Sequence, residues 1–151
     1  MKVFRLAPRK FANDISGTGA KLYGGRWNEK GIPCIYTSES RALAMCEFAV
    51  HQTLETMPST IQLVTLEVPN KSIFNVQLKK LPKDWRTYPT SFKLKRIGSE
   101  LLEANNYLII KVPSSIIPEE SNYILNPMHR DFEKIKLVSS DKYDFDERFK
   151  I

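Results

Sequence analysis

The stretch from residue 23 to residue 47, YGGRWNEKGIPCIYTSESRALAMCE, constrains this chain more than any other part of it. Two adjacent glycines precede Arg26, a short β-like run contains Tyr36, and a helical pattern carries Glu47. These polar residues lie about ten positions apart on a loop, a strand and a helix. The spacing predicts a turn–strand–helix unit, an arrangement that would allow the three side chains to converge on one site.

The glycine-containing turn has two local interpretations. Gly25 allows a backbone to approach a ligand closely, and the planar fork of Arg26 suits phosphate or carboxylate groups. Trp27 is expected to fix the loop by burial, and Asn28 by a side-chain bond to the backbone. A tight turn closed by a buried tryptophan, with no ligand, fits the same residues equally well. There is no GxGxxG sequence between a strand and a helix, so this is not a dinucleotide fingerprint.

Glu47 lies on a predicted helix that begins after Ser38 as N-cap and runs to about Glu55. Apolar residues recur along it at steps of three and four: Ala42, Leu43, Cys46, Ala49, Val50 and Leu54. Glu47 falls at the edge of this stripe, where a carboxylate must be paired or hydrogen-bonded. It is therefore either a structural ion-pair residue or a carboxylate facing a cleft.

The rest of the chain alternates strand and helix signals. Strands are expected at residues 2–6, 32–37, 61–68, 73–76, 107–112, around 123 and at 135–138, with loops at 8–20 and 77–89. A second helix is expected from Thr90 or Ser91 to about Ala104, with Phe92, Ile97, Leu101 and Leu102 facing inward. In the loop before it, Trp85 and Tyr88 are expected to pack on a hydrophobic surface. Ser114 and Ser115 follow the strongest strand, a common place for site residues, although an ordinary turn is the simpler local interpretation.

Composition bounds the class of protein. A chain of 151 residues with 42% hydrophobic and 26% charged residues suits one domain, 1–151, with a real core. No apolar run is long enough to cross a bilayer, and the N-terminus does not read as a signal peptide, so the cytoplasm is expected. Cys34 and Cys46 read as small buried hydrophobes, and no metal site or cofactor is expected. The net charge of +6 is dispersed, which leaves a non-catalytic module binding nucleic acid or an acidic partner as an alternative.

Six pieces, in this order, resemble the RES-domain family of toxins. They are Phe4-Arg5, GGRWN at 24–28, IYTSES at 35–40, ALAMCE ending in Glu47, VPSS at 112–115 and NYILNP at 122–127. The resemblance covers nearly the whole chain. It implies an α+β fold like that of ADP-ribosyltransferases: a single compact domain with a mixed, mainly antiparallel sheet flanked by helices. It also implies a partner, an Xre-type helix-turn-helix antitoxin in a hetero-oligomer, and no direct nucleic-acid binding by this chain.

The same resemblance implies an enzyme that consumes NAD+ as its substrate. Members cleave the nicotinamide–ribose bond by phosphorolysis or hydrolysis, with inorganic phosphate as a co-substrate in the first case; others are described as modifying a protein by ADP-ribosylation. Carried over by position, the catalytic residues are Arg26, Tyr36, Glu47 and Ser114. The residues implied to bind NAD+ are Arg5, Gly25, Arg26, Trp27, Asn28, Tyr36, Ser115 and Asn122. The adjacent serines leave the register at 114–115 open.

Overall fold

A computed structural model describes residues 1–149 of the chain. Its seven strands are β1 (Lys2–Pro8), β2 (Ile35–Ser38), β3 (Ile61–Glu67), β4 (Ile73–Asn75), β5 (Ile109–Pro113), β6 (Ser121–Leu125) and β7 (Lys136–Tyr143). Its α-helices are α1 (Thr18–Tyr23), α2 (Arg41–Ala49) and α3 (Phe92–Ala104), and short 3-10 helices lie at Arg9–Phe11, Leu78–Lys80 and Phe132–Lys134. The expected α+β class, with its mixed and mainly antiparallel sheet, is confirmed.

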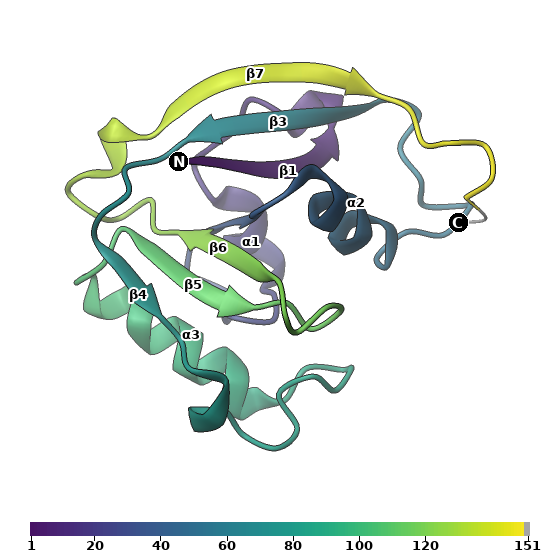
Figure 1. Cartoon of the computed structure of the whole chain (residues 1–151). Helices are drawn as coiled ribbons and strands as arrows, with labels where there is room; N and C mark the ends of the chain where they lie inside the picture. Colours follow the sequence, from purple (N-terminus) through teal and green to yellow (C-terminus); the bar gives the residue numbers. More distant parts are fainter. Residues whose placement is uncertain (150–151) are drawn as a thin grey trace.

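All seven strands form one sheet in the order β4-β5-β6-β2-β1-β3-β7 (Figure 1). Only β4 and β5 are parallel, and the connection between them carries α3. β1 pairs with β3 along its whole length, but it meets β2 at a single pair, Phe4 with Ser38. The sheet therefore opens between β1 and β2, and the helix α2 packs against both strands at this opening.

The core is divided by the sheet into separate clusters of buried side chains. One cluster joins Val3 of β1 to Val64 and Leu66 of β3. A second cluster packs Trp27 and Trp85 against Leu94 of α3. Both tryptophans are buried, as the sequence predicted. The turn before β2 is thereby held between the sheet and α3. Gly98 makes this possible, because a side chain there would collide with the backbone of Trp27.

The helix that carries Glu47 differs from its prediction at both ends. Its N-cap is Ser40, whose hydroxyl accepts a hydrogen bond from the Leu43 N–H at 3.0 Å. Ser38 was the wrong choice because it is still part of β2. The helix also stops at Ala49 rather than near Glu55. Beyond it, Thr53 and Thr56 bond to one another's backbone and side chains, which competes with helical hydrogen bonding.

Several side chains that were predicted to face inward are exposed, and the reason is similar in each case. Val50 and Leu54 lie past the end of α2 and are exposed, and the inner face of that helix is formed by Leu43 and Ala44. Phe92, at the first turn of α3, is exposed, as is Tyr88 before it. These residues belong to helix ends and loops, where the helical period no longer decides which face is covered.

The two cysteines behave differently. Cys34 is buried, as expected, and burial raises the pKa of its thiol to about 12. Cys46 on α2 is only partly buried, so the expectation of a buried residue fails there; the buried residues of that helix are Leu43 and Ala44. Neither cysteine forms a disulfide in the described chain.

Candidate active site

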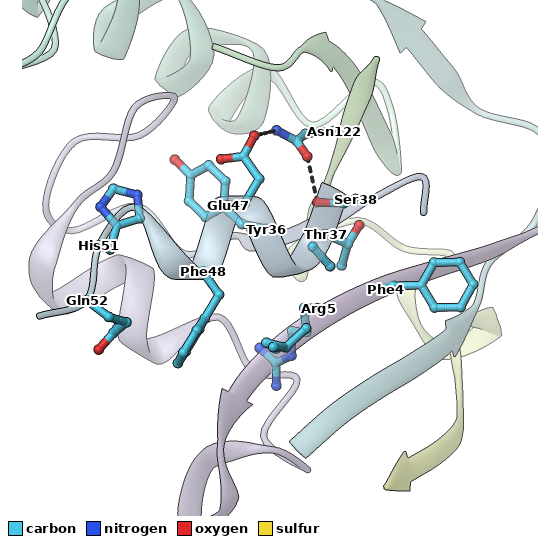
Figure 2. Close-up of a pocket in the computed structure, with 12 residues that line it drawn as sticks. Phe4, Arg5, Tyr36, Thr37, Ser38, Glu47, Phe48, His51, Gln52 and Asn122 are labelled. Atoms are coloured by element: carbon cyan, nitrogen blue, oxygen red, sulfur yellow. Dashed lines mark hydrogen bonds between the residues drawn. The ribbon is translucent and has the colours of Figure 1, made fainter. Parts of the chain in front are cut away.

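A cavity of about 240 Å³ lies at the opening between β1 and β2 (Figure 2). β1 forms one wall, β2 with the neighbouring β6 forms another, and α2 with the turn after it forms the third. The lining residues are Phe4, Arg5, Leu6, Tyr36, Thr37, Ser38, Ala44, Glu47, Phe48, His51, Gln52 and Asn122. Four of the residues predicted for the site therefore line one cavity: Arg5, Tyr36, Glu47 and Asn122.

The Glu47 carboxylate is held by two hydrogen bonds to the same oxygen. Oε1 accepts from the Ser114 hydroxyl at 2.8 Å and from the Asn122 side-chain amide at 2.5 Å. Asn122 is itself oriented by Ser38, whose hydroxyl donates to the amide oxygen at 2.7 Å (Figure 2). Within residues 1–149 the second carboxylate oxygen, Oε2, accepts no hydrogen bond. Glu47 thus offers a fixed, negatively charged oxygen to whatever enters the cavity.

Ser114 and Ser115 have distinct environments. The Ser114 side chain is fully buried, and its hydroxyl accepts from the backbone N–H groups of Ile116 and Ile117, each at 3.1 Å, while donating to Glu47. With those three bonds the hydroxyl has little capacity left for a ligand. Ser115 contributes its backbone carbonyl to a bond from Arg86 and does not line the cavity. The geometry therefore links Ser114, rather than Ser115, to Glu47.

The Tyr36 hydroxyl is committed to the protein. It donates to the side-chain oxygen of Asn28 at 2.7 Å and accepts from the Trp27 N–H at 2.9 Å. Burial raises the pKa of Tyr36 well above its usual value, so the phenol stays neutral. Asn28 is tied in turn to the carbonyls of Ala20 and Ile32. Tyr36 can therefore present its ring to a ligand, while its hydroxyl holds the turn.

This network also explains the glycine before Arg26. A Cβ added to Gly25 would come within 2.6 Å of the Tyr36 hydroxyl. The close approach that the sequence suggested is made by a protein side chain rather than by a ligand. Gly25, Trp27 and Asn28 do not line the cavity, and all three shape the turn that carries Arg26.

The two predicted arginines are held in different places: Arg5 lines the cavity, and Arg26 does not. One terminal nitrogen of Arg5, Nη2, donates to the carbonyls of Phe11, Ala12 and Asp14, while its Nε is buried without a partner in residues 1–149. Burial lowers the pKa of Arg5, and nearby Asp14 opposes this effect. Arg5 therefore brings a largely desolvated positive charge to the cavity wall.

Arg26 is outside the lining set but remains electrostatically coupled to it. Burial lowers the pKa of Arg26, and the negative charge of the nearby Glu47 carboxylate opposes that effect. Its Nη1 donates to the carbonyls of Trp85 at 2.8 Å and Thr87 at 3.1 Å. Arg26 thus ties the glycine-containing turn to the segment before α3, while its remaining N–H groups make no hydrogen bond within residues 1–149.

Some cavity residues were not predicted from the sequence. Phe4, Ser38 and Phe48 lie beside predicted residues but carried no chemical signal of their own. His51 had one: it follows Glu47 by four residues, so the helix predicted to run to about Glu55 would have placed the two side chains on one side; in the structure His51 lies in the turn after α2 and still lines the cavity. In the described range 1–149 no group of three His, Cys, Asp or Glu residues is arranged to hold a metal ion.

Fold and site together define a single-domain α+β protein with a carboxylate held in a cleft of its opened sheet. The same fold occurs in a chain of the solved M. tuberculosis MbcT–MbcA toxin–antitoxin complex, with a TM-score of 0.71 and 19% identity over 94% of this chain and 83% of that one. The RES domain family model matches residues 2–146, and this chain belongs to that family. The resemblance predicted from the six sequence pieces is thereby confirmed.

Curated relatives match this chain over nearly its full length. A protein named Toxin Res from Photorhabdus laumondii is 38% identical over 98% of this chain and 96% of its own length. A Toxin Res from Yersinia enterocolitica is 36% identical over 99% of this chain and all of its own length. A protein named Prs ADP-ribosylating toxin from a Sphingobium species is 37% identical over 91% of this chain and 87% of its own length.

Proposed function

We propose that this chain is a toxin that consumes NAD+ by cleaving its nicotinamide–ribose bond, through phosphorolysis or hydrolysis. The observation that carries the proposal is the Glu47 carboxylate, fixed by Ser114 and Asn122 in a cavity that also contains Arg5 and the Tyr36 ring. A fixed anion beside a desolvated cation and an aromatic ring suits a ligand with hydroxyls, phosphates and a flat ring.

The chemistry needs positioning and electrostatics more than it needs a strong base. When the bond between the ribose anomeric carbon and nicotinamide breaks, the bonding electrons pass to the ring nitrogen, and nicotinamide leaves as a neutral molecule. Positive charge then develops on the ribose. A preorganised carboxylate stabilises that charge without having to reorient during the reaction. Glu47 supplies it, because Oε1 is anchored and Oε2 is free to face the ribose.

The other residues take supporting roles. Arg5 and Arg26 hold the pyrophosphate by charge-assisted hydrogen bonds, using the donors that the protein itself leaves unpaired. The Tyr36 ring stacks on the nicotinamide. Ser114 and Asn122 act on the carboxylate more than on the substrate, and the basic surroundings also suit phosphate as the acceptor.

A toxin of this kind requires a partner that neutralises it. The relatives named Toxin Res and the MbcT–MbcA toxin–antitoxin complex support an antitoxin for this chain, and the family resemblance makes that partner an Xre-type helix-turn-helix protein in a hetero-oligomer. The site of action is the cytoplasm, where the NAD+ pool lies. No helix within residues 1–149 is long and apolar enough to span a membrane.

A second candidate function is transfer of ADP-ribose to a protein. It is favoured by the Sphingobium relative, which is named Prs ADP-ribosylating toxin. The same carboxylate and the same bond cleavage serve both reactions, and only the acceptor differs.

Product analysis separates these reactions. The purified chain is incubated with NAD+ with and without inorganic phosphate, and products are identified by mass spectrometry. ADP-ribose 1″-phosphate indicates phosphorolysis, and ADP-ribose indicates hydrolysis. A parallel reaction with labelled NAD+ and a bacterial lysate detects transfer to a protein. NAD+ that stays intact in every reaction, with no labelled protein, refutes the proposed function.

A further inference from the structure

Arg86 connects the segment before α3 to the loop that carries Ser114. Its Nε donates to the carbonyl of Ser115 at 2.9 Å, and its Nη2 donates to the carbonyl of Ile116 at 3.3 Å. In the described part of the chain, it is the one side chain outside residues 114–120 that hydrogen-bonds the backbone of residues 115–117. The bonds join residues 29 and 30 positions apart in the sequence.

The segment that carries Arg86 is itself held in place. Arg26 donates to the carbonyls on either side of it, those of Trp85 and Thr87. The Trp85 side chain is buried in the core, and the Thr87 N–H and hydroxyl both bond the carbonyl of Asp84. Arg86 therefore projects from a braced turn, and its exposed side chain is held at its tip by the two carbonyls that it contacts.

The loop that Arg86 contacts sets the position of Ser114. The backbone N–H groups of Ile116 and Ile117 donate to the Ser114 hydroxyl, and that hydroxyl donates to Glu47. The peptide that accepts from Arg86 through the Ser115 carbonyl is the same peptide whose N–H belongs to Ile116. A shift of this peptide moves the donor that directs the Ser114 hydroxyl toward the carboxylate.

We infer that Arg86 is a positioning residue for the NAD+ site, acting through the 115–117 backbone and Ser114 on Glu47. This inference rests on the proposed function for its kinetic consequence, whereas its structural part stands independently. The two arginines then have different roles. Arg26 binds the ligand and holds residues 85–87 in place, whereas Arg86 positions the Glu47 carboxylate through the 115–117 loop and does not contact the ligand.

The structural part is tested by amide hydrogen exchange on the full chain without any ligand. Arg86→Met keeps the aliphatic stem but removes both donors. Arg130→Met is the matched control, because Arg130 is an exposed arginine whose side chain makes no hydrogen bond in residues 1–149. The N–H groups of Ile116 and Ile117 are expected to exchange about tenfold faster in Arg86→Met, and to be unchanged in the control. Unchanged exchange at both positions in Arg86→Met overturns the inference.

The kinetic part uses NAD+ turnover. Arg86→Met is expected to lower kcat about tenfold with KM and melting temperature nearly unchanged, and Arg86→Lys, which keeps one donor, restores part of the loss. Combining Arg86→Met with Ser114→Ala is expected to give no further loss beyond Ser114→Ala alone, because both act through one hydroxyl. The inference is overturned if the double variant loses kcat by the product of the two single losses. It is also overturned if Arg86→Met lowers the melting temperature and leaves kcat intact. If the wild-type chain leaves NAD+ intact, the proposed function fails, and the exchange experiment still decides the role of Arg86.

Discussion

Replacing Glu47 with glutamine isolates the charge that the proposed reaction needs. Glutamine has nearly the same shape, and its amide oxygen can accept the bonds from Ser114 and Asn122 that Oε1 now accepts at 2.8 and 2.5 Å. What is lost is the negative charge on the unpaired oxygen. Because the two anchoring bonds persist, the free energy of unfolding should change by no more than about 1 kcal/mol.

The expected loss of activity follows from the charge. The attraction between a carboxylate and a full positive charge about 4 Å away has an energy of about 4 kcal/mol at an effective dielectric constant of about 20. The ribose carries only part of a charge in the transition state, so a loss of about 2–4 kcal/mol is expected. That corresponds to a fall in kcat of about 30- to 1000-fold, with a smaller change in KM.

The assay follows the initial rate of NAD+ loss at several concentrations, together with the melting temperature of each variant. Glu39→Gln is the matched control, because Glu39 is exposed, lies outside the cavity and accepts one bond from the Ser121 N–H at 2.9 Å. Its kcat should match that of the wild type. A Glu47→Gln variant that keeps wild-type kcat would show that the carboxylate charge does not stabilise the transition state.

Three further predictions concern the residues around Glu47. Arg26→Ala should raise KM for NAD+ at least tenfold. It should also lower the unfolding free energy by about 1–2 kcal/mol, because the Trp85 and Thr87 carbonyls lose their donor. An unchanged KM with lost turnover would instead assign Arg26 a role in the chemical step. Gly25→Ala should destabilise the chain by about 1–3 kcal/mol in denaturant melts, because the new methyl group displaces the Tyr36 hydroxyl. Gly19→Ala should not, because a methyl group there points into open space. Equal stabilities of the two variants would contradict the packing at Gly25. Burial raises the pKa of the Cys34 thiol to about 12 in the folded state, while the unfolded thiol ionises near 9, so the unfolding free energy should fall as pH rises from about 9 towards 12. Cys34→Ala should flatten that slope, and an identical slope in both proteins would refute the assignment.

The local elements were predictable because their signals are local. Alternating apolar residues and turn residues placed β1, β3 and β6, and a serine cap with helical periodicity placed α3 close to its observed bounds. The order of motifs along 151 residues also sufficed to indicate the family, which the match over residues 2–146 confirms. The end of α2 was missed because the Thr53–Thr56 turn competes with the helix through side-chain bonds that the apolar period does not report.

The sequence by itself determined which residues were candidates, and the tertiary structure decided what each of them does. Glu47 meets Ser114 and Asn122 across 67 and 75 positions, and only strand order in the sheet brings those side chains to one carboxylate. Gly25 faces Tyr36 instead of a ligand, which no local pattern reveals. The bonds from Arg26 and Arg86 end on backbone carbonyls, and every residue has one. Such acceptors leave no trace in the sequence, because the fold rather than the side-chain type determines which carbonyls an arginine can reach.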